Sequence, residues 1–413
     1  MLAEAPPAAS RSRSIEIITF TTLYPNAIQP NHGVFVENRL RHLIAGGGIA
    51  SRVIAAVPWF PSGNARFGRY ADYAKVPAAE ERYGLSIVHP RYPLLPKLGM
   101  AAAPVALFLA ALPTLRRLAR ERDFDLIDAH YFYPDGVAAT WLAQALKKPV
   151  VITARGTDVN FIPRYALPRW QIQTAANSAT ALIAVSQALK DALIALGVPD
   201  EKIVVLRNGV DLEIFHPADR GAARSQLALD GPTLLSVGHL IERKAHHLVI
   251  GAMPRLPEYR LLIVGDGPER VNLAALVSQR GLESRVRFLG AVAHRELCRI
   301  YAAADALVLA SSREGWPNVL LEAMACGTPV VASRSWGNPE VVRAPEAGVL
   351  MNERTEAGIV DAVQRLFQAV PDRDATRRYA EQFSWDATSR GQITLFRSIL
   401  ERRRAASAPR RPI

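Results

Sequence analysis

Two glutamates eight positions apart are the residues of this chain whose types and spacing point most directly to chemistry. Glu314 lies in a loop that also carries Gly, Trp and Pro, and Glu322 lies in the apolar segment that follows. An isolated glutamate near the start of a helix is commonly surface charge that complements the helix dipole. The pair favours a binding role, because a carboxylate accepts two hydrogen bonds from a cis-diol, worth about 1.5–3 kcal/mol each when water is excluded.

The elements around these glutamates place them at the edge of a parallel sheet. The apolar run from Ala306 to Ala310 predicts a buried strand, Pro317 occupies a first helical position, and Gly327 marks the end of that helix. In a strand, loop, helix crossover the loop lies at the carboxyl end of the strand, where open parallel sheets bind ligands. The helix N-terminus offers free N–H groups and a positive dipole, so the segment predicts a phosphate position beside the two carboxylates.

The stretch from Glu314 to Glu322 closely resembles the defining motif of the retaining family 4 glycosyltransferases, which have the GT-B fold. The resemblance implies that Glu322 binds the ribose hydroxyls of a nucleotide sugar and that Glu314 lies against the transferred sugar. It also implies an α/β fold in which two Rossmann-like domains face each other across a cleft that can close on the substrate. The donor-binding residues that it implies are Glu322, Gly315, Trp316, Pro317, Asn318, Val319, Gly238 and Gly265.

A basic pair, Arg243 and Lys244, follows a predicted strand at Thr233 to Val237. The resemblance implies that these two side chains hold the donor diphosphate and belong, with Glu314 and Arg155, to the catalytic set. Two cations beside two phosphates also stabilise charge on the leaving group, so we expect neither a metal ion nor a cofactor. On local grounds the pair could be solvated charge, although the helix dipole disfavours positive side chains at a helix start.

Two shorter patterns argue for other ligands and are set aside. Gly265 opens a Gly-Asp-Gly-Pro sequence that resembles a dinucleotide fingerprint, but Arg270 stands where the third glycine belongs, so NAD binding is weakly supported. Asp123 and Asp125 match the metal-binding triplet of the other major glycosyltransferase fold. That triplet precedes a predicted strand rather than ending one, so we predict no metal site there.

The resemblance assigns four residues of the N-terminal half to the acceptor side or the cleft, namely Gly33, His130, Asp158 and Asn208. Gly33 would let the backbone approach a ligand closely, and a plain turn glycine before the helix predicted at 33–44 is an equal alternative. His130 ends a strand at the rim of the cleft, although a lone histidine is more often structural. Asp158 could simply cap the next turn, and Asn208 belongs to an Asn-Gly turn signal at the junction between the domains.

Arg155 is the position at which this chain departs from the family pattern. It opens Arg-Gly-Thr-Asp, where the family usually has a histidine that contacts the transferred sugar. An arginine cannot act as a base at neutral pH, but it can stabilise charge on a phosphate or a sugar oxygen. The sequence leaves its role open.

The length of 413 residues predicts two domains, because single hydrophobic cores stop growing near about 250–300 residues. The expected strands are 15–20, 50–57, 125–129, 150–154, 181–185 and 203–206 in the first domain, and 233–237, 261–264, 285–289 and 306–310 in the second. Loops and short elements are expected at 59–92. The expected division is a disordered tail at 1–14, an acceptor domain at 15–207, a linker at 208–217, a nucleotide-sugar domain at 218–380, a helix crossing back to the first domain at 381–403, and a basic tail at 404–413.

Composition and charge bound the compartment and the partners. The two cysteines, Cys298 and Cys326, both in predicted helices, indicate a reducing compartment without a disulfide framework. The first 14 residues lack the apolar core of a secretory signal, so we expect a cytoplasmic protein. The net charge of +12 comes without any recognisable nucleic-acid-binding module. It therefore favours an anionic membrane face over nucleic acid as a partner, and a peripheral position at the inner membrane face.

The segment from Leu98 to Leu115 carries no charged side chain and has about the length that crosses a bilayer. It also contains Pro104 and Pro113 and lies between predicted strands of one domain. A spanning helix would split that domain across the membrane. A helix packed on the sheet is therefore favoured, with a shallow interfacial helix as the alternative.

The sequence as a whole predicts a retaining transfer of a sugar from a nucleotide sugar, of UDP or GDP type, to a hydroxyl of a glycan or lipid-linked acceptor. Cell-surface or exopolysaccharide synthesis is the expected setting. A nucleotide-sugar epimerase or a phosphorylase of the same fold is the alternative from another enzyme class. A basic protein that binds a membrane or nucleic acid is a further alternative, and the two carboxylates in the expected cleft argue against it.

Overall fold

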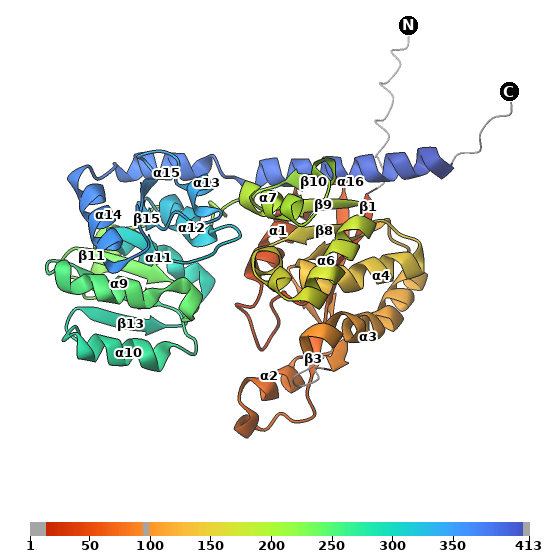
Figure 1. Ribbon diagram of the computed structural model, residues 1–413, viewed down its shortest axis with the longest axis horizontal. Coiled ribbons are helices and arrows are strands. Elements are labelled where there is room, and N and C mark those ends of the chain that lie inside the picture. The colour runs from red at the N-terminus through yellow and green to blue at the C-terminus, as the bar shows by residue number, and fades with distance from the viewer. Residues whose placement is uncertain (1–13, 94–98, 408–413) are drawn as a thin grey trace, which may run out of the picture.

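The computed structural model describes residues 14–93 and 99–407. Within those ranges the chain forms two α/β units that lie side by side, one built from the N-terminal half and the other from most of the C-terminal half (Figure 1). The tail expected at 1–14 lies outside the described residues except for its last residue. Leu98 and the part of the basic tail beyond residue 407 also lie outside them.

The first unit is organised around a sheet whose described strands follow the order β10-β9-β8-β7-β1-β2-β5-β4. Its pairs are parallel except for β4 with β5. The central strands are buried along their whole length, as expected for parallel strands covered by helices on both faces. The strands are β1 (Ile15–Thr21), β2 (Ile49–Ala55), β4 (Ala79–Arg82), β5 (Leu85–Val88), β7 (Leu126–His130), β8 (Val150–Ala154), β9 (Ala181–Ala184) and β10 (Ile203–Val205).

The region 59–92 consists of loops and short elements, as expected, and two of these elements extend the sheet. This region adds the antiparallel pair β4 and β5 to the edge of the sheet, and β3 (Val57–Trp59) pairs with β6 (Arg91–Pro93) in a separate ribbon. The alternation of exposed and half-buried residues in β4 is typical of an edge strand. Because β4 is only four residues long, this pattern does not stand out in the sequence among the aromatic and proline residues around it.

Helices cover the faces of this sheet and its connections. The expected apolar segment forms α3, which packs on α4 with the rings of Phe108 and Trp141 at 6.1 Å. This helix is long and apolar enough to cross a membrane by length and composition alone, and 28% of its apolar window is buried. Leu109 on its outer face is 62% exposed. The helices are α1 (Val34–Ala45), α2 (Arg69–Lys75), α3 (Gly99–Glu121), α4 (Val137–Leu146), α5 (Thr157–Asn160), α6 (Ala166–Ser178) and α7 (Gln187–Ala195).

The second unit is a parallel sheet in the described order β13-β12-β11-β14-β15-β16. This is the doubly wound order of a dinucleotide-binding fold, in which the strand order reverses between β11 and β14, and ligands bind at the carboxyl ends of the strands at that reversal. The strands are β11 (Thr233–Val237), β12 (Arg260–Val264), β13 (Val286–Gly290), β14 (Ala306–Leu309), β15 (Val330–Ala332) and β16 (Gly348–Leu350). The helices are α8 (Arg220–Gln226), α9 (His246–Ala252), α10 (Arg270–Gln279), α11 (Leu297–Ala303), α12 (Asn318–Ala325), α13 (Asn338–Val341), α14 (Glu356–Gln368) and α15 (Arg373–Glu381).

The last helix, α16 (Trp385–Ser407), leaves the second unit and runs along the first (Figure 1). Its residues Ile393 and Phe396 share an apolar cluster with Val36 and Leu40 of α1. Val210, where the chain passes between the units, donates its N–H to the carbonyl oxygen of Phe383. The two connections between the units therefore lie together.

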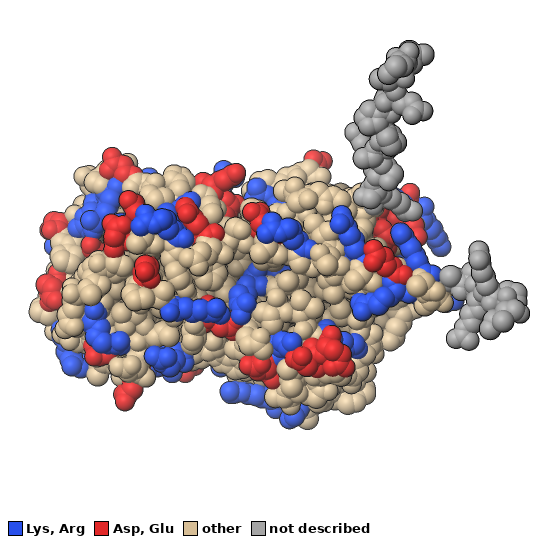
Figure 2. All heavy atoms as spheres, turned by 90° about the horizontal axis from the view of Figure 1, so that it is seen from above, with Lys and Arg blue, Asp and Glu red and all other residues tan. Residues whose placement is uncertain are grey.

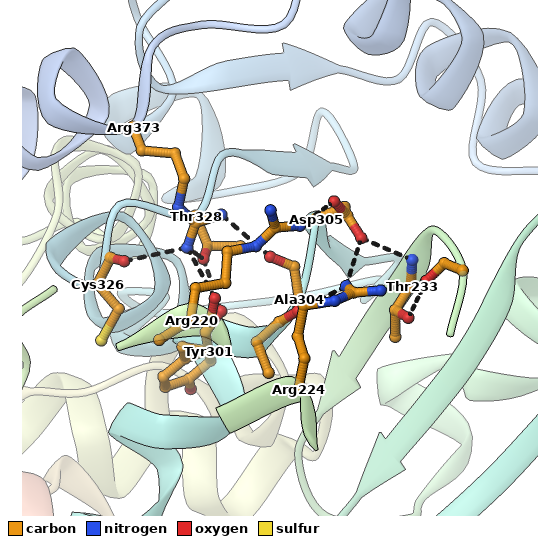
Figure 3. Close-up of polar contacts among 12 residues, drawn as sticks. Arg220, Arg224, Thr233, Tyr301, Ala304, Asp305, Cys326, Thr328 and Arg373 are labelled. Carbon is orange, nitrogen blue, oxygen red and sulfur yellow. Dashed lines mark hydrogen bonds and ion pairs between the residues drawn. The ribbon is translucent and has the colours of Figure 1, made fainter. Parts of the chain in front are cut away.

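Polar contacts at the amino ends of β11, β14 and β15 fix the starts of these strands (Figure 3). Asp305, just before β14, accepts hydrogen bonds from Arg224 and from the backbone N–H of Thr233 at the start of β11. Arg373 of α15 donates to the carbonyl oxygen of Ala304 and to the hydroxyl of Thr328. These contacts hold the two strands that flank the order reversal in register.

On the face seen in Figure 2, basic and acidic side chains are interspersed over both units.

The two cysteines differ in their position relative to the helices. Cys298 lies in α11, whereas Cys326 is the residue after α12 and not inside it, because the chain turns there toward Gly327. Both thiols are free and buried, with their sulfur atoms 3.7 Å apart.

Candidate functional site

The loop between β14 and α12 carries Glu314 at the carboxyl end of the sheet, as the sequence predicts. One local expectation was wrong: Pro317 precedes α12 as its cap residue instead of occupying the first helical position. Its ring fixes φ, which is −85°, but leaves ψ free, and the observed ψ of 76° is not helical. Gly327 follows the helix with a φ of +76°, a conformation that glycine adopts without strain.

Glu314 is buried and paired with both members of the basic pair. Its Oε1 lies 2.7 Å from Lys244 Nζ, and its Oε2 lies 3.4 Å from Arg243 Nη1. The two cations sit in a short 3-10 turn, η5 (Glu242–Lys244), directly after β11. Burial alone would raise the pKa of Glu314, but the charges of Lys244 and Arg243 hold it below its ordinary value. The three side chains thus form a compact charged cluster at the point where the strand order reverses.

Glu322 projects from α12 and is 7% exposed. Its Oε1 lies 3.0 Å from His294 Nε2, and its Oε2 accepts a hydrogen bond of 2.9 Å from the hydroxyl of Tyr301. Burial lowers the pKa of His294, but the charge of Glu322 and the hydrogen bond to it outweigh that effect, and the net pKa lies above its ordinary value. Each carboxylate oxygen therefore has one protein donor and keeps lone-pair capacity for a ligand.

His294 and Tyr301, which sequence reasoning missed, are themselves held in place. The ring of Phe215 lies 5.0 Å from His294 and 5.9 Å from Tyr301. The carbonyl oxygen of Tyr301 accepts a hydrogen bond of 2.6 Å from the hydroxyl of Thr328, which Arg373 supports from the other side (Figure 3). A histidine and a tyrosine seven residues apart gave no signal by themselves, because only the fold brings them to Glu322.

A cavity of about 670 Å³ opens above Glu322 between the two units. The second unit contributes Gly238, Gly265 and Glu322 to its wall, and α1 with the loop before it contributes His32 and Phe35. A Cβ on Gly265 would lie 1.9 Å from the carbonyl oxygen of Gly238, so only glycine fits there. The predicted donor residues Gly238, Gly265, Asn318, Val319 and Glu322 thus line one cavity.

A second cavity of about 290 Å³ adjoins the first and shares Phe35, Asn318 and Val319 with it. Its wall holds Glu314 with Arg243 and Lys244, and it continues the cleft toward the first unit. The sequence-predicted residues that line it are Arg155, Asn208, Arg243, Lys244, Glu314, Gly315, Trp316, Pro317, Asn318 and Val319.

Glycines bring the two units into direct contact beside this second cavity. A Cβ on Gly315 would lie 1.8 Å from the carbonyl oxygen of Arg155, and a Cβ on Gly156 would lie 3.1 Å from the backbone nitrogen of Gly315. Within the second unit, a Cβ on Gly337 would lie 2.6 Å from the carbonyl oxygen of Gly315. The loop that carries Glu314 is therefore packed backbone to backbone against the end of β8.

Arg155 joins a buried polar network of the first unit. Its Nη2 lies 2.6 Å from His130 Nδ1, and its Nη1 donates to Asn208 Oδ1 at 3.1 Å. His130 Nε2 lies 3.2 Å from Asp128 Oδ2, and burial lowers the pKa of His130 to about 4. A neutral His130 therefore accepts from Arg155 and donates to Asp128. His130 does not line either cavity, so the structure places it behind Arg155 instead of at the rim.

For two further residues of the first unit the structure shows the local structural role that the sequence left open. Asp158 does not face the cleft: its carboxylate accepts the backbone N–H groups of Phe132, Arg155 and Gly156, which occupy its oxygens and fix the loop after β8. Gly33 does not line the cavities either. Its φ is +71°, and a Cβ there would lie 2.3 Å from the backbone of Leu23, so the glycine serves the fold of its own loop.

No group of three or more His, Cys, Asp or Glu side chains that could hold a metal ion occurs in the described part of the chain. The chemistry available in the cleft is that of carboxylates, guanidinium and ammonium groups, and backbone N–H groups at the start of α12.

Two family models match separate parts of this chain. Residues 72–214 match the model described as Glycosyltransferase Family 4, and residues 219–383 match the model described as Glycosyl transferases group 1. The first range includes Arg155 and Asn208, and the second includes the basic pair with Glu314 and Glu322.

Curated relatives match about half of this chain. D-inositol 3-phosphate glycosyltransferase of Mycobacterium leprae (strain Br4923) is 37% identical over 213 residues, which make up 48% of this chain and 50% of that protein. The protein of the same name from Mycobacterium bovis (strain BCG / Pasteur 1173P2) is 34% identical over 219 residues, 49% of this chain and 45% of that protein. The chain thus spans about half the length of the curated relatives it matches.

Solved structures with the same arrangement include sucrose-phosphate synthase from Thermosynechococcus elongatus, with a TM-score of 0.77 and 21% identity over 94% of this chain and 100% of that one. They also include HepE from Anabaena in complex with UDP, with a TM-score of 0.69 and 21% identity over 93% of this chain and 100% of that one. At this identity the likeness concerns the fold.

Proposed function

The chain belongs to the GT-B glycosyltransferases of the family 4 type, and from that premise we propose that it moves a sugar from a nucleotide sugar to a saccharide hydroxyl with retention of configuration. The residues of the cleft support this proposal separately for the ribose, the diphosphate and the transferred sugar. The acceptor is a glycan or a lipid-linked saccharide of cell-surface or exopolysaccharide synthesis.

The observation that carries the proposal is the geometry of Glu322. Its carboxylate lies in the wall of the larger cavity, beside the glycine turns that follow β11 and β12. His294 and Tyr301 each contact one of its two oxygens and leave that oxygen with capacity to accept from a ligand. A ribose 2′,3′-diol presents two donors at the matching spacing, so Glu322 binds the ribose of the donor nucleotide.

The diphosphate of the donor lies between the basic pair and the start of α12. Arg243 and Lys244 neutralise its charge, and the free N–H groups of the helix N-terminus add a positive dipole end. Both cations also contact Glu314, so they are fixed before the donor arrives. Fixed cations stabilise the charge that develops on the leaving phosphate without reorganising at the moment of reaction. The transfer therefore proceeds with these side chains and without a metal ion.

Retention follows when the acceptor hydroxyl attacks from the side of the leaving group. The departing phosphate then takes the proton of the hydroxyl, and the cleft needs no separate carboxylate base. Glu314, held by two cations, stays ionised and lies against the transferred sugar, where it stabilises positive charge at the reacting carbon. The backbone contact between Gly315 and Arg155 holds the two units together at this end of the cleft.

Uracil is the donor base that we favour. HepE, which shares the fold, has been solved in complex with UDP and with UDP-glucose. Guanine is the alternative base, so both UDP-glucose and GDP-mannose are tested as donors.

A membrane surface is the proposed setting of the acceptor. Helix α3 presents Val105 and Leu109 to solvent and ends in Arg116, Arg117 and Arg120. An apolar face followed by basic residues is typical of a helix that lies in the interface of an anionic membrane. The enzyme would then act at the cytoplasmic face, where a lipid-linked acceptor is within reach.

Transfer is tested with purified protein, UDP-glucose and GDP-mannose, and a lipid-linked saccharide fraction as acceptor. We expect a nucleoside diphosphate and a new glycoside in equal amounts, with the anomeric configuration of the donor as read by NMR. Glu322→Gln should lower kcat/KM about a hundredfold, because it removes charged hydrogen bonds to the ribose. Glu296→Gln, on the exposed turn beside the site, is the matched control and should behave as wild type. Free sugar or an isomerised donor in place of a glycoside would refute the proposal.

A further inference from the structure

Arg155 carries a buried positive charge that no carboxylate of the described chain neutralises by an ion pair. The side chain is 8% exposed and lines the smaller cavity. Its two hydrogen-bond partners are the amide oxygen of Asn208 and Nδ1 of His130, and both partners are uncharged near neutral pH. Its Nε has no hydrogen-bond partner among the described residues. Buried guanidinium groups normally occur with a paired anion, so this one needs an explanation.

The closest carboxylates, Asp128 and Asp158, favour the charged form of Arg155 through space but make no ion pair with it. Asp128 faces His130 and accepts from the amide nitrogen of Gln392. Asp158 is saturated by three backbone N–H groups. A second buried guanidinium, that of Arg39, shares the acceptor Asn208 with Arg155 and also donates to Gln392. Burial, followed by the charge of Arg39, lowers the pKa of Arg155 well below its ordinary value, and the charges of Asp128 and Asp158 offset this only in part.

Other donors of the same cavity wall are also unpaired. The indole N–H of Trp316, a residue that is 6% exposed, has no partner among the described residues, and neither has Nε of Arg313. Buried donors without partners are rare in native proteins, and three of them around one cavity show that its wall holds more donors than acceptors, although these three nitrogens themselves have almost no accessible surface.

The charge of the cavity wall exceeds what the donor diphosphate needs. Four cations line it, Arg155, Arg243, Lys244 and Arg313, against the single carboxylate of Glu314. Arg243 and Lys244 already serve Glu314 and, in the proposed function, the diphosphate. Arg155 and Arg313 remain for a further anion. The planar fork of a guanidinium matches the planar oxygens of a carboxylate.

We propose that this cavity recognises an acidic saccharide, with Arg155 binding the carboxylate of a sugar acid such as a hexuronic acid. The inference rests on the proposed function and names its substrate class. The carboxylate belongs either to the transferred sugar of the donor or to the acceptor sugar beside it, and the chemistry of recognition is the same in both cases.

The donor arm of the test measures Kd by calorimetry for UDP, UDP-glucose and UDP-glucuronic acid, with GDP, GDP-mannose and GDP-mannuronic acid as the second set. The acceptor arm measures binding of methyl glucuronide and methyl glucoside to the protein saturated with the nucleoside diphosphate. Each arm compares wild type with Arg155→Gln and Arg155→Lys. Arg164→Gln, an exposed arginine that does not line the cavity, is the charge-loss control.

In one arm, wild type should bind the acidic sugar about tenfold or more tightly than the neutral sugar. Arg155→Gln should abolish this preference, Arg155→Lys should retain only part of it, and Arg164→Gln should keep the wild-type preference. The arm that shows the preference identifies the source of the carboxylate. Equal affinity for acidic and neutral sugars in both arms, or a preference that persists in Arg155→Gln, would overturn the inference. Failure of wild type to bind any nucleotide would instead overturn the proposed function, and this inference with it.

Discussion

Gly315 lies against the carbonyl oxygen of Arg155 so closely that a Cβ on the glycine would be 1.8 Å from that oxygen. The contact joins the loop of the second unit that carries Glu314 to the end of β8 in the first. Backbone atoms cannot rotate away as a side chain can, so a methyl group here must push the two units apart.

Gly315→Ala should therefore disturb the reacting geometry more than the fold of either unit. A displacement of the order of 1 Å can lower turnover about a hundredfold. The measurement is kcat with the donor that supports transfer, together with Tm. Gly231→Ala is the matched control, since the nearest atoms to its Cβ would be 4.0 Å away. Wild-type turnover in Gly315→Ala would show that the contact is not part of the active arrangement.

The pairing of His294 with Glu322 predicts a pH-dependent part of stability. The pKa of His294 is raised in the folded protein, since Glu322, with Asp211 and the hydrogen bond, outweighs burial. A group whose folded pKa is raised contributes stability that is fully present below its unfolded pKa of about 6.5 and is lost as the pH rises through the folded value. His294→Gln keeps an N–H donor but no charge, so the Tm difference from wild type should be largest near pH 5.5 and shrink by pH 8.5. A constant Tm difference across that range would contradict the charged pairing.

The cluster at Glu314 predicts the opposite dependence. The pKa of Glu314 is lowered, because Lys244 and Arg243 outweigh the effect of burial, so its contribution is present above the ordinary value of about 4.5 and is lost as the pH falls through the folded pKa. Lys244→Met removes the partner at 2.7 Å and should cost about 3 kcal/mol at pH 7, with a smaller difference at pH 4. Denaturant unfolding measures it.

Lys190→Met is the control for that experiment. Lys190 pairs with Asp200 at 2.8 Å, but the Asp200 side chain is 67% exposed, so the loss should stay below about 1 kcal/mol. Equal losses in the two variants would show that burial adds nothing to the pairing at Glu314.

Continuous apolar runs that end at turn residues such as glycine made the strands of both sheets predictable from sequence. The expected strands lie within two residues of those observed, from β1 at Ile15–Thr21 to β14 at Ala306–Leu309, because parallel strands buried on both faces have continuous apolar sequences. The placement of Glu314 and Glu322 at the carboxyl edge followed from the same reasoning. The short edge strand β4 did not, because its pattern is polar and only four residues long.

The partners of the predicted site residues could not be read from the sequence. Tyr301 and His294 meet Glu322 from positions 21 and 28 residues away, and Asn208 meets Arg155 across 53 residues. Such distances in sequence carry no periodicity. The roles of Gly33 and Asp158 stayed open for the same reason: a residue type fits a ligand-binding role and a local structural role equally well until its neighbours are known.

Helix α3 predicts binding to anionic membranes. Leu109→Ser removes a side chain that is 62% exposed and available to the lipid interface, and it should weaken cosedimentation with vesicles containing phosphatidylglycerol about tenfold. Val271→Ser, at a residue of α10 that is 76% exposed on the other unit, should leave vesicle binding unchanged. Equal binding by the two variants would place the membrane contact elsewhere or remove it.

The central claim is that Glu322 and the basic pair bind the nucleotide of a nucleotide sugar. The most direct test is a titration of wild type, Glu322→Ala and Glu296→Ala with UDP, GDP and ADP, monitored by thermal unfolding. One nucleotide at about a hundred times its Kd should stabilise wild type and Glu296→Ala by about 2.7 kcal/mol and leave Glu322→Ala nearly unchanged. No response of wild type to any of the three nucleotides, or equal stabilisation of Glu322→Ala, would contradict the claim.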